Sequence, residues 1–140
     1  MAIEIDHLGI AVRSLEEGLR FYEDALGMAV SGREKIAAEQ VEVAMLPAGA
    51  GTNPPRIELL EATGEASPIA RYIEKRGPGL HHIALRVDDL ENTIERLKSE
   101  GARVLQEPRR GAGGHLYVFV HPATTGGVLL ELIQKEPVKD

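Results

Sequence analysis

The sequence predicts an α+β fold built from two paired βαβββ modules, whose strands form a curved sheet around a shared concavity. Two observations predict it. A strand-like run that carries His7 has a counterpart 75 residues later (82 − 7) that carries His82. A later run that carries Glu58 likewise recurs with Glu131. Because repeated units of this size bury their apolar surfaces against each other, we expect the two halves to pair.

The first half is expected to form a strand, a helix and three further strands. Ser14, followed by Glu16 and Glu17, is typical of a capped helix start after the first strand. Gly27 is expected to end this helix, and an extended pattern then resumes. The expected strands cover residues 3–12, 28–33, 41–46 and 56–61.

The second half repeats this order of elements. Leu90, Ile94 and Leu97 have the spacing of one helix face, and Gly101 follows as a stop signal. The strand-like runs on either side of this helix follow the order of the first half. The expected strands cover residues 80–87, 103–106, 116–121 and 128–134.

A linking helix is expected over about residues 67–76, between the halves. Ser67 offers a side-chain cap, and Pro68 stands in the first turn, where proline is tolerated. This helix connects the halves without separating domains. The predicted organisation is a single domain, 1–140, with an internal repeat of residues 1–63 and 79–135.

The composition is that of an ordinary globular protein, because 43% of the 140 residues are hydrophobic and 27% are charged. There is no cysteine, which agrees with a reducing cytoplasm and leaves nitrogen and oxygen as the metal donors. A net charge of −6 and the absence of Trp argue against a nucleic-acid partner. The first residues do not resemble a secretion signal, and no apolar run reaches the roughly 20 residues of a membrane span.

Four strand residues are candidate metal ligands, His7, Glu58, His82 and Glu131. The histidine and the glutamate are 51 residues apart in the first half (58 − 7) and 49 in the second (131 − 82). Because side chains alternate along a strand, all four can face the concavity. A single strand histidine is more often a hydrogen-bonded core residue, but recurrence of both residue types favours a metal site. This donor set suits Co²⁺, Mn²⁺, Ni²⁺ or Zn²⁺.

Five segments carry a resemblance to a known family: residues 6–12, 57–70, 79–87, 111–114 and 121–132. Together they resemble the methylmalonyl-CoA epimerase family of the vicinal oxygen chelate superfamily, which also includes glyoxalase I and extradiol dioxygenases. The histidine-containing runs are typical of the superfamily as a whole. The Ser-Pro-Ile-Ala linker and the Gly-Val-Leu-Leu-Glu-Leu ending indicate the epimerase branch.

The resemblance implies an enzyme that epimerises methylmalonyl-CoA at C2. It implies metal ligation by the four residues that the internal repeat already selects. The bound cation would stabilise the enolate that forms when the C2 proton is removed. An acyl-CoA substrate and a homodimer are also implied. The side chains that contact CoA stay open among Arg71, Lys75, Arg109 and Arg110.

Inversion at C2 requires a proton donor or acceptor on each side of the substrate. Glu131 is expected to be one base as well as a ligand. An ungapped comparison with the family places Glu42 at the second base. Glu42 can equally be the polar side of an amphipathic strand. Glu39 is the alternative base if the ill-defined segment before it hides a one-residue gap.

Two rival functions share the expected fold. A glyoxalase I-type lyase resembles the chain at the same four ligand positions and also moves a proton at a metal. A metal-free module that binds a small molecule is the non-enzyme rival. A dioxygenase is disfavoured, because a fourth protein ligand crowds the positions that iron needs for oxygen and catechol.

Overall fold

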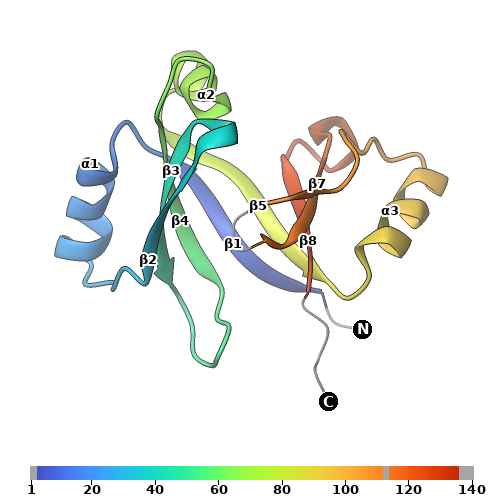
Figure 1. The fold of residues 1–140 in the computed structure, drawn as a ribbon, viewed down its shortest axis with the longest axis horizontal. Helices are drawn as coiled ribbons and strands as arrows, with labels where there is room; N and C mark the ends of the chain where they lie inside the picture. Colours follow the sequence, from blue (N-terminus) through green and yellow to red (C-terminus); the bar gives the residue numbers. More distant parts are fainter. Residues whose placement is uncertain (1–2, 112–113, 136–140) are drawn as a thin grey trace. The chain divides into compact units, whose positions relative to one another are not determined.

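The computed structural model describes residues 3–111 and 114–135 (Figure 1). Its contacts divide the chain into two compact units, and β1 and β5 each contribute residues to both. We call residues 7–81 the first module, and residues 3–6 with 82–135 the second module. The α+β class is confirmed, and the order of one strand, a helix and three strands occurs twice. The prediction of a single domain stays a prediction.

The first module has the strand order β2-β3-β4-β1. β4 pairs with β1 in parallel and with β3 in antiparallel orientation, and β2 lies antiparallel to β3. β2 begins at Gly32 rather than at Met28, because the amide of Met28 still bonds to the carbonyl of Tyr22 in the preceding helix at 3.0 Å. The strands are β1 (Glu4–Ala11), β2 (Gly32–Ile36), β3 (Val41–Pro47) and β4 (Arg56–Ala62).

The predicted helix starts of the first module are confirmed. Ser14 accepts a hydrogen bond from the amide of Glu17 at 3.1 Å, and Ser67 accepts one from Ile69 at 3.2 Å. None of the helices among the described residues is long and apolar enough to cross a membrane. The helices are α1 (Leu15–Leu19), its π-helical continuation η1 (Arg20–Ala25), the short η2 (Ala37–Glu39) and α2 (Pro68–Arg76).

The sheet of the first module has two different faces. On one face, α1 packs against Ala44, Leu46 and Leu59, which are completely buried. Gly18 permits this approach, because a Cβ atom at that position would lie 2.9 Å from Leu59 Cδ1. On the other face, Ile69 of α2 packs in a cluster with Ala11, Val41, Val43 and Leu60.

The second module has the strand order β5-β8-β7-β6, with β5 and β8 parallel. The expected strand at residues 103–106 is reduced to an isolated bridge between Val104 and Val120. The short β6 forms after Pro108, which has no amide proton to donate to a sheet. The elements are β5 (Gly79–Val87), α3 (Leu90–Ser99), β6 (Arg109–Arg110), β7 (Leu116–Val120), η4 (Pro122–Thr124) and β8 (Leu130–Gln134).

The sheet of the second module also has a helix-covered face. Leu90 and Ile94 of α3 pack there in a cluster that includes Val118 and Leu132. The opposite face carries Ala84, Tyr117 and Ile133, with Phe119 packed against them. The two modules therefore share one design, in which one face is apolar and covered by a helix.

In each module, a side chain on the glutamate-bearing strand accepts a hydrogen bond from the first amide of the helix. Oε1 of Glu61 on β4 accepts from the amide of Leu15 at 2.6 Å. Oε1 of Gln134 on β8 accepts from the amide of Leu90 at 2.7 Å. Glu61 and Gln134 each follow the candidate ligand of their strand by three residues, so they point to the opposite face of the sheet. These strands therefore position a helix on one face and a candidate ligand on the other.

Candidate metal centre

The first module holds His7 and Glu58 as a buried pair. His7 Nδ1 lies 3.4 Å from Glu58 Oε2, and the two residues are 5% and 7% exposed. β1 and β4 are parallel neighbours, with Gly9 opposite Glu58. Since Gly9 is two residues after His7, both side chains point to the face of the sheet away from α1.

A third residue, Arg56, contacts the glutamate of this pair. Its Nη2 and Nε atoms donate hydrogen bonds to Oε2 of Glu58 at 3.0 and 3.3 Å. The side chain of Arg56 is 22% exposed, so this ion pair is mostly shielded from water. Sequence reasoning did not select Arg56, although its position two residues before Glu58 places it on the same face of β4.

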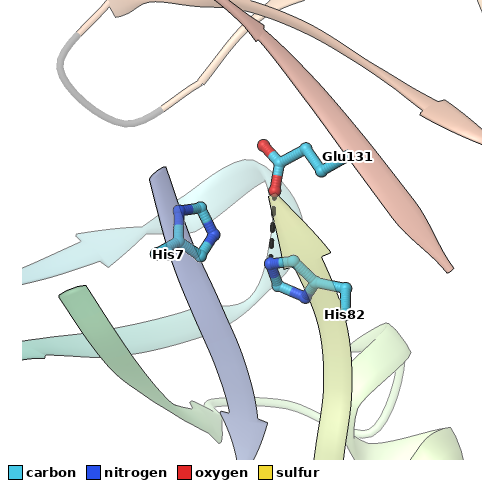
Figure 2. A group of neighbouring side chains, drawn as sticks. All are labelled: His7, His82 and Glu131. Carbon is cyan, nitrogen blue, oxygen red and sulfur yellow. Dashed lines mark ion pairs between the residues drawn. The ribbon is translucent and has the colours of Figure 1, made fainter. Parts of the chain in front are cut away.

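The second module holds the equivalent pair, His82 and Glu131. Figure 2 shows the ion pair between them, in which His82 Nε2 lies 3.2 Å from Glu131 Oε1. Ala84, two residues after His82, lies opposite Glu131, so the register matches that of the first module. The ring of Phe119 meets the His82 ring edge to face, with 5.7 Å between the centroids.

The donor atoms of each pair fit a divalent cation. Each module supplies one imidazole nitrogen and one carboxylate oxygen on adjacent parallel strands. All four side chains are at most 13% exposed, whereas buried carboxylates ordinarily need a cationic or hydrogen-bonding partner. Nitrogen and oxygen donors of this kind suit borderline divalent metals.

Glu42 lies on the other face of the first module. In the register of β3 and β4, Glu42 is opposite Glu61, whereas Met45 is opposite Glu58. Residues directly opposite each other share a face, and faces alternate along a strand, so Glu42 and Glu58 point in opposite directions. Oε2 of Glu42 instead lies 3.3 Å from Nη2 of Arg33. The structure does not bring Glu42 together with the ligand pair of this module.

Glu39, the alternative base, lies in η2 and is exposed. A different acidic residue shares the ligand face, Glu34 on β2. Glu34 is opposite Val43, and Val43 is opposite Leu60, which follows Glu58 by two residues. The sequence did not indicate Glu34, because the segment that contains β2 shows a weak strand pattern.

The remaining histidines have structural contacts. The His81 ring packs edge to face on Tyr72, with 5.0 Å between centroids. His121 caps η4, since its Nδ1 accepts from the amide of Ala123 at 2.9 Å. Nδ1 of His115 lies 3.4 Å from the carbonyl oxygen of Gln134.

Of the four cationic residues considered for CoA contacts, Arg71 and Lys75 lie on α2, and Arg109 and Arg110 form β6. Arg110 donates a hydrogen bond to the carbonyl oxygen of Gly114 at 2.8 Å. Residues 112–113 of the glycine-rich segment lie outside the described residues. The geometry gives none of the four a contact that is specific for CoA.

Comparison with known proteins identifies the family. Residues 6–119 match the Glyoxalase/Bleomycin resistance protein/Dioxygenase superfamily. The ethylmalonyl-CoA/methylmalonyl-CoA epimerase of Cereibacter sphaeroides is 40% identical over 134 residues, which are 93% of this chain and 96% of that protein.

Solved structures agree with this match. The methylmalonyl-CoA epimerase of Mycobacterium tuberculosis has a TM-score of 0.86 and 38% identity, covering 96% of this chain and 89% of that one. A variant of the Streptomyces coelicolor methylmalonyl-CoA epimerase in complex with 2-nitronate-propionyl-CoA has a TM-score of 0.89 and 35% identity, covering 96% and 98%. The chain therefore belongs to the Glyoxalase/Bleomycin resistance protein/Dioxygenase superfamily and, within it, to the methylmalonyl-CoA epimerase family.

Proposed function

We propose that the chain is a methylmalonyl-CoA epimerase, which inverts C2 of methylmalonyl-CoA by 1,1-proton transfer through an enolate. The observation that carries this proposal is the buried histidine–glutamate pair, which occurs at matched strand positions in both modules. Its support comes from relatives of nearly the same length that are named methylmalonyl-CoA epimerases.

His7, Glu58, His82 and Glu131 are the proposed ligands of one divalent cation, Co²⁺, Mn²⁺, Ni²⁺ or Zn²⁺. The nitrogen and oxygen donors and their burial support this assignment. When bound, the cation supplies electrostatic stabilisation of the negative charge that develops on the thioester oxygen. The protein's part is to hold the four donors in a shielded position.

Glu131 is the proposed base of the second module. A carboxylate is a suitable proton acceptor when it is positioned beside the C–H bond and protected from water. The Glu131 side chain is 13% exposed, and on β7 the residue opposite it is the aromatic Phe119. These surroundings limit competition from solvent.

The second base was predicted to be Glu42, and that role stays a prediction. The strand register does not support it, because Glu42 shares a face with Glu61 rather than with Glu58. Glu34 is an acidic residue on the ligand face of the same module. Inversion still requires a proton donor or acceptor on the side of C2 opposite Glu131.

An acyl-CoA substrate is proposed because a structural relative of the chain is a complex with 2-nitronate-propionyl-CoA. A homodimer, a cytoplasmic location and the lack of nucleic-acid or membrane partners stay predictions from the sequence.

The test is isotope exchange during turnover. Purified protein, stripped of metal and then loaded with each of the four metals in turn, is incubated with one C2 epimer of methylmalonyl-CoA in deuterated water. We expect inversion together with deuterium at C2, measured by NMR and mass spectrometry. Absence of both with all four metals would refute the proposal.

A parallel assay separates the rival functions. The glutathione hemithioacetal of methylglyoxal lacks the malonyl carboxylate, and we expect no turnover of it. Turnover of this compound without epimerisation would assign the chain to the lyases. A protein that neither retains a metal nor exchanges the C2 proton would be a binding module.

A further inference from the structure

The two candidate glutamate ligands have different neighbours at equivalent positions. Glu58 and Glu131 are 73 residues apart (131 − 58), so the residue equivalent to Arg56 is Leu129 (56 + 73). The first module therefore has a positively charged arginine two residues before its glutamate, and the second module has an uncharged leucine there.

The arginine acts on one particular atom. Oε2 of Glu58 accepts from Arg56 Nη2 at 3.0 Å and from Nε at 3.3 Å, and the same oxygen lies 3.4 Å from His7 Nδ1. Two N–H groups of one guanidinium therefore hold the oxygen that faces the histidine. Since Glu58 is 7% exposed, water weakens this interaction less than it would at the surface.

We propose that Arg56 is a positioning residue that holds Glu58 and offsets its negative charge. This inference rests on the proposed function. Two neutral histidines and two carboxylates give a charge of −2, and Arg56 reduces it to −1. The cation is then held less tightly by the protein, and more of its charge remains available to the thioester oxygen of the substrate. In the second module, Leu129 stands at the position equivalent to Arg56.

The inference predicts opposite changes in metal affinity and turnover. In Arg56→Leu, Glu58 no longer shares its oxygen with a guanidinium, and the like charge beside the cation is gone. We expect Mn²⁺ to bind about tenfold more tightly, from the Coulomb energy of charges a few ångströms apart in partly shielded surroundings. We expect kcat to fall about tenfold, with little change in KM. A residue that bound the substrate's carboxylate would raise KM instead.

The experiment measures the Kd of Mn²⁺ by isothermal titration calorimetry on the metal-free full chain, and kcat and KM of epimerisation on the loaded protein. Arg33→Leu is the matched control, because it removes the same charge from an arginine–glutamate pair on the other face of this sheet. We expect it to change the Kd less than about twofold. Arg56→Lys retains the positive charge and is expected to recover most of the wild-type Kd and kcat.

Weaker or unchanged Mn²⁺ binding in Arg56→Leu would overturn the inference. If that variant does not fold, as judged by circular dichroism, Arg56→Gln takes its place with the same expected direction. The two proposals fail differently. A wild-type protein that exchanges no C2 proton refutes the function, whereas an active wild-type protein with an unchanged Kd in Arg56→Leu refutes only the role of Arg56.

Discussion

The first and second modules carry the same histidine–glutamate pair in the same strand register, but in different surroundings. Glu58 is held by Arg56, whereas Glu131 lies opposite Phe119 and has Leu129 two residues before it. An internal repeat can thus preserve the positions of two side chains while the residues around them differ. We propose that Glu58 serves only as a metal ligand, whereas Glu131 also accepts the C2 proton.

The faces that carry the pairs differ as well. In the first module, α2 adds the apolar side chain of Ile69 to the face on which Glu58 lies. In the second module, the same face includes Arg86, whose Nε lies 3.8 Å from Oδ1 of Asp6, and both residues are buried. Buried ion pairs are costly to desolvate and are by themselves weak evidence for stability.

The largest expected effect separates the two glutamates. We expect Glu131→Gln to reduce kcat by roughly 10²- to 10⁴-fold, the usual contribution of a positioned base, because an amide cannot accept the C2 proton. Glu58→Gln keeps an oxygen donor, and we expect it to reduce kcat less than about tenfold. Steady-state rates and C2 deuterium exchange measure both. Equal losses in the two variants would contradict the division of tasks.

The next effect compares the two cores. Leu59 and Leu132 are equivalent residues, buried against α1 and in the α3 cluster. We expect each Leu→Ala substitution to lower the unfolding free energy by about 2–5 kcal/mol. Urea unfolding monitored by circular dichroism measures this, and a single domain predicts one transition that shifts in both variants. Two transitions, with only one of them shifted by each substitution, would contradict the single domain.

A smaller expected effect concerns the acidic residues on the two faces of the first module, Glu42 and Glu34. We expect Glu42→Gln to change kcat less than about threefold, because the residue pairs with Arg33 on the face opposite Glu58. Glu34→Gln is expected to have the larger effect of the two. The measurement is kcat for both epimers of the substrate. A severe loss in Glu42→Gln alone would restore Glu42 as the second base.

The smallest expected effect concerns an ion pair of the second module. Nζ of Lys135 lies 2.9 Å from Glu4 and 3.4 Å from Asp88. Lys135 lowers the pKa of Glu4 below its ordinary 4.5, mainly by a hydrogen bond, so the pair stabilises the fold above that pH and the contribution is lost as pH falls through the lowered pKa. Glu4 in turn raises the pKa of Lys135 above 10.5, so the contribution is lost again as pH rises through that raised value.

This ion pair is exposed and its effect on stability is small. We expect Glu4→Gln to melt slightly below the wild-type protein at neutral pH. At about pH 2 we expect the two proteins to melt at the same temperature, because the side chain of residue 4 is then uncharged in both. Thermal melting at the two pH values measures the difference. A melting difference that persists unchanged in acid would assign the effect to packing rather than to charge.

Local features of the fold were predictable. The caps at Ser14 and Ser67 predicted helix starts correctly, because capping depends on residues within one turn. The bounds of β2 and β6 were not predictable, because their pairing partners lie elsewhere in the chain. Propensity is weak for such edge strands, and the pairing partner decides where they begin.

By itself, the amino-acid sequence determined the repeated βαβββ order and selected the four candidate ligands, because spacing and alternation are properties of the covalent chain. Only the tertiary structure decided that Glu42 faces away from Glu58 and that Arg56 holds the Glu58 carboxylate. The physical reason is strand register. A shift of one residue between β3 and β4 would exchange the faces of every side chain, and only the pairing of distant segments sets that register.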